Sequence, residues 1–273
     1  MPVTQFRQIS REKKAMFGNS FSISSRVVNA LILRELNSRY GNSRLGYLWA
    51  IANPIISIMV LFFLFSTIRS RETGDIPILM FLVTGWFSYG YYQTMVSSIA
   101  NGEAANRSLM MHQPVTRLDV MASRAVVETL TTVSFFVVGV AIAAIIEDAT
   151  LPNDPILVLA SFAAAGTFGL SLGLAMGAIL TYFPFAMNFL QPVNRIGFFV
   201  SGVLFTATML PSWLYPYIRW NPMLHPIEGI RQGWFEVYTS PVLDLTYTFS
   251  IALPLLAVGL YLERRTRRGI KFS

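Results

Sequence analysis

The chain has 273 residues, of which 53% are hydrophobic and 13% are charged, and its mean hydropathy is +0.52. An ordinary soluble domain carries about 25% charged residues, so this composition is typical of a membrane protein. The absence of cysteine from the sequence excludes disulfides, thiolate metal sites and thiol catalysis. The net charge of +7 would suit nucleic acid only on a soluble basic face, which an apolar chain does not favour.

A short amphipathic helix is predicted after the polar start of the chain. Val28, Ile32 and Leu36 repeat at four-residue spacing, and Ser24 or Ser25 can cap the first turn. The helix is charged and too short to cross a bilayer, so we expect it to lie along the cytoplasmic membrane surface. A solvated linker helix is the alternative interpretation.

Long uncharged stretches predict six membrane-spanning helices, because a crossing needs roughly 20 apolar residues. The stretch 155–194 is too long for one crossing, and Pro184 favours a break within it. The predicted fold class is therefore an all-α integral membrane protein. The spans are expected near residues 47–68, 78–100, 129–146, 156–181, 186–208 and 245–262.

The positions of basic residues predict the orientation, because Lys and Arg in short loops stay on the cytoplasmic side. Of the 21 Lys and Arg residues, only Arg69, Arg71, Arg219 and Arg231 fall in loops on the opposite face. Both termini are therefore expected in the cytoplasm. The predicted organisation is a cytoplasmic N-terminal segment with the surface helix (1–44), a transmembrane domain (45–262) and a basic cytoplasmic tail (263–273).

The largest cytoplasmic loop between spans, residues 101–128, is polar and contains Pro114. In a transporter driven by a separate motor, a short helix in this loop is where force would be applied. A passive connector is the alternative interpretation.

The fourth predicted span carries a small residue at every fourth position, a pattern that lets helix backbones approach closely. Whether this ridge packs within the subunit or across a dimer is left open by the sequence. Its members are Ser161, Ala165, Gly169, Gly173, Gly177 and Thr181.

The outer segment between the fifth and sixth predicted spans, residues 210–244, is aromatic and divided by prolines. It is too apolar for an aqueous loop, so we expect short helices that dip back into the outer leaflet.

Enzymatic chemistry has little support in the sequence. Ser171 lies in a G-x-S-x-G pattern, but that pattern works on a strand-to-helix elbow, whereas Ser171 falls in the middle of a predicted span. There is no P-loop and no H-E-x-x-H. Glu147 and Asp148 are interpreted as solvated loop charges, and His112 and His225 are expected on opposite sides of the membrane, which argues against a metal site.

Arg195 is the ionisable residue that lies well inside an apolar region, where it costs about 2.5–3.5 kcal/mol on insertion scales. It either meets an anionic substrate in an aqueous pathway or extends to the lipid headgroups. In the second span, Trp86, Tyr89 and Tyr92 suit the apolar faces of sugar rings. The same residue types populate the interfacial belts of membrane proteins, so that alternative stays open.

Three segments carry a resemblance to a known family. The stretch from Leu31, LILRELNSRYGNSRLGYLWAIANPI, resembles the opening signature of type-2 ABC exporter permeases. SIANGEAANRSLMMHQPVTRLDVMASRAVVE resembles their connection between spans two and three, and LPSWLYPYIRWNPMLHPIEGIRQGWF resembles their outer region. The resemblance covers residues 20–265 and looks closest to the capsular-polysaccharide permeases of Gram-negative bacteria. One departure is Phe183-Pro184-Phe185, where many members have an Arg-Asp pair.

This resemblance implies a homodimer in the inner membrane that works with two copies of a separate ABC ATPase. ATP and Mg would be bound by that partner, and this chain would hold no cofactor. A periplasmic co-polymerase or adaptor, outer-membrane export proteins and a lipid-linked, anionic capsular polysaccharide are the other implied partners. Alternative cargoes within the family are O-antigen, teichoic acid, drugs or lipids. A proton-coupled secondary carrier should show carboxylates inside its spans, and the predicted spans have none.

Three groups of candidate site residues follow from the residue patterns and the resemblance together. The substrate-channel candidates are Arg195, Arg231, Tyr89, Tyr92 and Trp86. The candidates for contact with the ATPase are Arg34, Arg39, Tyr40, Arg107, His112, Gln113, Pro114 and Arg117. The outer-gate candidates are Trp213, Asn221, Pro222, His225 and Glu228.

Overall fold

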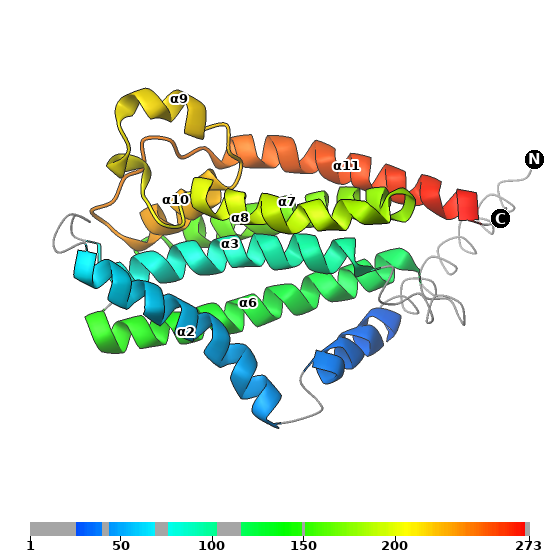
Figure 1. Cartoon of the computed structure of the whole chain (residues 1–273), viewed down its shortest axis with the longest axis horizontal. Helices are drawn as coiled ribbons and strands as arrows, with labels where there is room; N and C mark the ends of the chain where they lie inside the picture. The colour runs from blue at the N-terminus through cyan, green and yellow to red at the C-terminus, as the bar shows by residue number, and fades with distance from the viewer. Residues whose placement is uncertain (1–25, 40–43, 69–75, 103–115, 149–150, 271–273) are drawn as a thin grey trace, which may run out of the picture.

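The computed structural model describes residues 26–39, 44–68, 76–102, 116–148 and 151–270. Every regular element in these ranges is a helix. Most of the long helices run side by side along one axis, whereas the helix at 44–68 crosses them obliquely (Figure 1). They are a helix at 26–39, α2 (Arg44–Ile68), α3 (Ile78–Ala100), α6 (Arg117–Glu147), α7 (Pro155–Tyr182), α8 (Met187–Val200), α9 (Tyr215–Ile218), α10 (Leu224–Trp234) and α11 (Leu245–Ile270), with 3-10 turns at Pro184–Ala186, Ala207–Met209 and Ser212–Leu214.

Three of the described helices are long and apolar enough to cross a membrane, judged by length and composition. They are α6, α7 and the Leu245–Arg265 part of α11, and Ala52–Thr67 in α2 is a shorter apolar helix. The other two predicted spans coincide with α3 and α8. α3 has 23 residues but carries many Ser, Thr and Tyr side chains, and α8 has only 14 residues.

The fifth predicted span, 186–208, is longer than the helix that forms there. α8 ends at Val200, and the chain then takes a left-handed turn at Gly202, whose φ is +82°. Such a φ strains residues with a Cβ and is readily adopted by glycine. The segment after α8 is therefore irregular backbone whose carbonyl groups need partners other than a helix.

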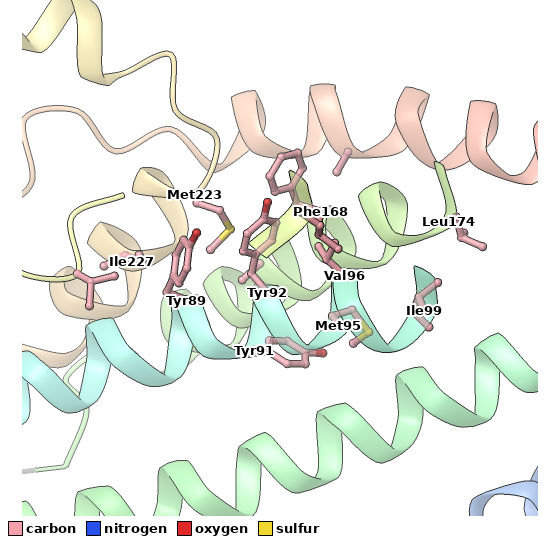
Figure 2. Packing of buried hydrophobic residues seen from close by; sticks show 14 of the residues in the cluster. Tyr89, Tyr91, Tyr92, Met95, Val96, Ile99, Phe168, Leu174, Met223 and Ile227 are labelled. Atoms are coloured by element: carbon pink, nitrogen blue, oxygen red, sulfur yellow. The ribbon is translucent and has the colours of Figure 1, made fainter. Parts of the chain in front are cut away.

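α7 lies at the centre of the bundle and packs against α3, α11 and α10. Its small-residue ridge faces α3 within the same subunit: a Cβ at Gly169 would lie 2.9 Å from the Tyr92 carbonyl oxygen, and one at Gly173 would lie 2.8 Å from the Ile99 Cβ. The sequence left open whether the ridge packs within the subunit or across a dimer, and these two glycines pack within the subunit. Figure 2 shows Tyr92, Met95, Val96 and Ile99 of α3 on this packed face, opposite Phe168 and Leu174 of α7.

Side chains cap the first turns of α6, α7 and α3. Thr116 and Asp119 form a capping box at the start of α6, and Asp154 caps α7 immediately before Pro155. The interpretation of Glu147 as a solvated charge is wrong, because its carboxylate accepts a hydrogen bond from the Leu79 amide at 2.8 Å. It also accepts the Met80 amide at 3.2 Å, so the end of α6 caps the start of α3. A carboxylate there complements the helix dipole.

Candidate functional site

A polar stripe runs along one face of α8. Asn188, Gln191 and Arg195 are all exposed in the protomer, and their spacing of three and four residues places them on one side of the helix. Apolar neighbours on the same helix are equally exposed, including Phe189 (64%) and Ile196 (66%). α8 therefore presents both an apolar and a polar surface to whatever surrounds the protomer.

The opposite face of α8 is fixed to α3 by aromatic side chains. The Tyr89 hydroxyl donates to the Asn194 carbonyl oxygen at 2.6 Å, and Trp86 meets Phe198 edge to face at 5.4 Å. Asn194 itself is buried. Arg195 consequently points away from the protomer core.

Two of the substrate-channel candidates lie inside the protomer. Tyr89 is only 2% exposed, and Tyr92 stacks on Phe168 with the ring centroids 5.4 Å apart (Figure 2). Trp86 is half-buried. In the described structure these rings hold α8 and α7 against α3, and only Arg195 of the candidates on α3 and α8 is exposed.

Arg231, the remaining channel candidate, is fully buried at the end of the bundle that carries α9 and α10. Its Nη1 donates to the carbonyl oxygens of Gly202 at 2.6 Å and Phe205 at 2.8 Å, and its Nη2 donates to that of Val203 at 3.0 Å. The guanidinium also lies 4.0 Å from the Phe81 ring centroid. Arg231 thus supplies the donors that the irregular backbone after α8 requires.

Glu228 belongs to the same cluster of Glu228, Arg231, Tyr238 and Ser240, which we call the outer cluster after the side of the membrane predicted for it from sequence. The Glu228 carboxylate lies 3.4 Å from Arg231 and accepts hydrogen bonds from the Ser240 hydroxyl at 2.7 Å and from the Tyr238 hydroxyl. Burial, followed by the negative charge of Glu228, raises the pKa of Tyr238, so the phenol stays a donor. Glu228 was expected at a gate, and it lies inside a closed hydrogen-bond network.

The other outer-gate candidates make contacts near this cluster. The Asn221 amide donates to the Ser201 hydroxyl at 3.0 Å, and the Pro222 carbonyl accepts from Thr248 at 3.0 Å. His225 is buried, whereas Trp213 is 67% exposed. The structure therefore brings four of the five outer candidates together between α8 and α11 and leaves Trp213 on the surface.

A second group of charges joins the helix 26–39 to the bundle at the opposite end. Arg39 Nη2 donates to the Glu128 carboxylate at 2.6 Å and Arg39 Nε donates to Glu35 at 3.1 Å. Arg124 lies 3.7 Å from Glu35 and donates to the Ser98 carbonyl oxygen at 2.8 Å. We call Glu35, Arg39, Ser98, Arg124 and Glu128 the inner cluster.

The inner cluster contains Arg39 from the ATPase-contact candidates, and it also contains residues that sequence reasoning missed. Glu35 and Arg39, and likewise Arg124 and Glu128, are opposite charges four residues apart on one helix, which is a recognisable signal. Partial burial disfavours the charged form of Arg39, but the hydrogen bond and charge of Glu128 outweigh it and raise the Arg39 pKa.

The remaining ATPase-contact candidates are placed only in part. Arg34 is exposed on the helix 26–39, and Arg117 begins α6. Tyr40, Arg107, His112, Gln113 and Pro114 lie outside the described residues.

Among the described residues, neither a serine nucleophile at Ser171 nor a metal centre is supported. The Ser171 hydroxyl is buried and donates to the Phe168 carbonyl oxygen of its own helix at 2.8 Å. In the same ranges, no group of three or more His, Cys, Asp or Glu side chains is placed to hold a metal ion. What the geometry offers is an exposed polar stripe on an apolar helix and two charge clusters at opposite ends of the bundle.

Apolar helices of membrane-spanning length, packed around a glycine-bearing central helix, define this chain as a multi-pass membrane protein. The chain belongs to the ABC-2 type transporter family, which matches residues 26–235. It is therefore a membrane transport subunit of that family.

Named relatives extend this match along nearly the whole chain. The polysialic acid transport protein KpsM of Escherichia coli is 27% identical and aligns over 94% of this chain and 100% of its own. The capsule polysaccharide export inner-membrane protein CtrC of Neisseria meningitidis serogroup A is also 27% identical, with 94% of this chain and 97% of CtrC covered. The O-antigen export system permease protein RfbA of Klebsiella pneumoniae is more distant, at 22% identity over 83% of this chain and 86% of RfbA.

Proposed function

We propose that two copies of this chain form the pore of an ATP-driven exporter that moves a lipid-linked, acidic capsular polysaccharide across the bacterial inner membrane. Two copies of a separate ABC ATPase would bind ATP and Mg and drive the motion. The observation that carries the proposal is the exposed polar stripe of Asn188, Gln191 and Arg195 on α8.

The free-energy cost of exposing these polar side chains to lipid favours a pore-facing position for the stripe. An arginine near the centre of a membrane helix costs about 2.5–3.5 kcal/mol, and polar residues inside membranes usually face a protein interior or water. In the protomer, nothing described covers Arg195. A second copy facing α8 would enclose an aqueous path and leave the exposed apolar side chains of α8 to the subunit interface.

Six crossings follow if α2, α3 and α8 span the membrane as well as α6, α7 and α11. α3 is long enough at 23 residues, and its Tyr and Ser side chains are buried against neighbouring helices rather than facing lipid. α8 reaches only about 21 Å at 1.5 Å per residue. The irregular segment after Gly202, held by Arg231, completes this crossing inside the protein, where non-helical backbone is tolerated.

The two ends of the bundle suit different surroundings. The inner end carries the helix 26–39 and the charged end of α11, so we place it, with both termini, in the cytoplasm beside the ATPase. The outer end carries the short α9 and α10 with exposed Trp213, Tyr217 and Trp220, a residue set typical of a membrane interface. We place α9 and α10 as re-entrant helices there, facing the envelope partners of the exporter.

The cargo is inferred from Arg195 and from the relatives. A dimer presents two copies of Arg195 to one path, and guanidinium groups bind carboxylates or phosphates of an acidic glycan. The relatives named for polysialic acid and capsule polysaccharide support the same class of cargo. Tyr89, Tyr92 and Arg231 would then position α8 rather than touch the glycan.

Cysteine scanning tests the pore directly, because the natural chain contains no cysteine. Asn188→Cys, Gln191→Cys and Arg195→Cys should react with a membrane-impermeant thiol reagent in intact complexes. Phe189→Cys and Ile196→Cys are the matched controls on the same helix and should react at least tenfold more slowly. Equal reaction at all five positions would remove the basis for an aqueous path along α8.

The cargo and the motor need separate tests. Arg195→Ala should lower export of an acidic glycan, and Arg195→Lys should retain more export because it keeps the charge. Unchanged export by Arg195→Ala would end the proposed role of this residue.

The motor and the orientation are tested separately. This chain, purified together with the ATPase encoded beside its gene, should co-elute with that ATPase. A reporter fused to either end of the chain should report a cytoplasmic location.

A further inference from the structure

A concave pocket lies at the outer end of the bundle, apart from α8 and its polar stripe. Its volume is about 620 Å³, within the range of small-molecule sites. The walls come from α9, the start of α10 and the start of α11. The residues that matter to its chemistry are Tyr215, Arg219, Trp220, His225, Asp244 and Tyr247.

Internal hydrogen bonds fix the walls of this outer pocket. His225 Nδ1 accepts the Asp244 amide at 3.1 Å, and His225 Nε2 pairs with the Arg219 carbonyl oxygen at 2.8 Å. The Tyr247 hydroxyl donates to the Trp220 carbonyl oxygen at 3.0 Å. The connection between α9 and α10 is thereby tied to the start of α11, so the pocket is formed before any ligand binds.

Two charged side chains in the pocket have hydrogen-bonding groups available for a ligand. Among the described residues, the Arg219 guanidinium makes no hydrogen bond or ion pair, and the residue is exposed. Asp244 uses one carboxylate oxygen to accept the Tyr247 amide at 3.1 Å, which leaves the other oxygen as an acceptor. The pocket therefore offers five N–H donors and one acceptor beside aromatic rings.

We propose that this pocket binds one carboxylated sugar unit of the exported chain at the outer end of the protein. Arg219 would pair with the sugar carboxylate, Asp244 would accept from a ring hydroxyl, and Trp220 and Tyr215 would cover the apolar face of the ring. A glycerol-based phosphodiester headgroup fits less well, because it presents no apolar ring face to Trp220 and Tyr215. This inference rests on the proposed export of an acidic glycan.

Direct binding to the full chain, purified with its ATPase in zwitterionic nanodiscs, tests the pocket without an export assay. The probes are an oligoglucuronate and a glucose oligosaccharide of the same length and linkage. Arg219→Gln should weaken oligoglucuronate binding about tenfold, as expected for loss of a charged hydrogen bond, and leave the neutral probe unchanged. Trp220→Leu should weaken both probes.

Matched controls separate the pocket from general effects of charge and aromatic content. Arg264→Gln changes an exposed arginine on α11 outside the pocket, and Tyr261→Leu changes an exposed aromatic side chain on α11 that does not line it. Neither should alter binding. Monodisperse elution with the ATPase shows that each variant is folded.

The possible outcomes decide between the pocket and the proposed function. If Arg219→Gln binds oligoglucuronate as the natural chain does while the α8 cysteines react as expected, the pocket assignment is wrong and the pore remains. If the α8 cysteines fail to react but binding still depends on Arg219, the proposed function is wrong and the pocket remains. A tryptophan fluorescence response to anionic lipid that Trp220→Leu abolishes, without a response to oligoglucuronate, identifies a headgroup site and overturns the proposal.

Discussion

The molecule places an arginine–glutamate cluster at each end of its bundle, and the two differ in how they are enclosed. In the outer cluster, the Arg231 and Glu228 side chains are both 0% exposed. In the inner cluster, the Arg39 side chain is 29% exposed and the Glu128 side chain 6%. The outer pair lies three residues apart on α10, whereas the inner pair joins two helices that are far apart in the sequence.

The difference in burial indicates that the outer cluster is rigid and that the inner cluster can open. Removing one member of a buried charge network leaves unpaired groups that water cannot reach, so the outer cluster should act as a fixed structural lock. A partly exposed ion pair contributes little net free energy, so the inner contact can open and close at small cost. An exporter whose motor binds at the inner end would need this combination of a rigid outer end and a movable inner joint.

Replacing Arg231 should produce the largest effect and break the outer lock. Arg231→Met removes the donors to the Gly202, Val203 and Phe205 carbonyls and leaves the Glu228 charge buried, which should cost about 3–5 kcal/mol of stability. The measurement is the thermal unfolding midpoint of the purified chain in one detergent. Arg195→Met is the matched control and should leave the midpoint almost unchanged, because Arg195 is exposed. Equal midpoints for the two variants would contradict the lock.

Replacing Glu228 should have a smaller effect on the same cluster. Glu228→Gln keeps an oxygen to accept from Tyr238 and Ser240 but removes the charge beside Arg231, so about 1–3 kcal/mol should be lost. Glu236→Gln changes an exposed carboxylate two residues before Tyr238 and serves as the control. A stability gain in Glu228→Gln would mean that the buried negative charge is a net cost to the fold.

Much of the helical arrangement could be predicted from sequence because hydrophobic length and charge position leave few choices. α3 begins and ends at the predicted residues, and the glycine ridge of α7 was visible as a packing face. The early end of α8 could not be predicted, because it depends on carbonyl partners supplied by Arg231, which is distant in the sequence. The capping of α3 by Glu147 likewise depends on a contact between helix ends.

The candidate site was predicted less completely, for the same reason. Arg195 stood out because a lone charge in an apolar run needs an explanation, and the structure leaves it exposed. Glu35 and Glu128 were not among the candidates, because only the fold brings them together at Arg39. Tyr89 and Tyr92 were interpreted as sugar contacts or as part of an interfacial belt, and only tertiary contacts place them in the core.

Replacing Glu128 should separate stability from coupling at the inner joint. Glu128→Gln weakens the contact with Arg39, but Arg39 is partly exposed and can be solvated, so stability should fall by about 1 kcal/mol or less. Glycan export should nevertheless fall several-fold relative to ATP hydrolysis, because the helix 26–39 loses the Arg39–Glu128 pair, which is shorter than its Arg124–Glu35 contact with α6. Export per ATP hydrolysed, measured in reconstituted vesicles, checks this. Export and hydrolysis falling by the same factor would argue against a coupling role.

Salt should give the smallest effect and distinguish the two clusters without further substitution. Raising the ionic strength from about 0.1 M to 1 M shortens the Debye length from about 10 Å to about 3 Å, and screening acts mainly on charges that solvent reaches. The difference in unfolding midpoint between the natural chain and Glu128→Gln should therefore shrink, while the difference for Arg231→Met stays constant. If both differences shrink together, solvent reaches Arg231 as well, and the outer end would be a second movable joint.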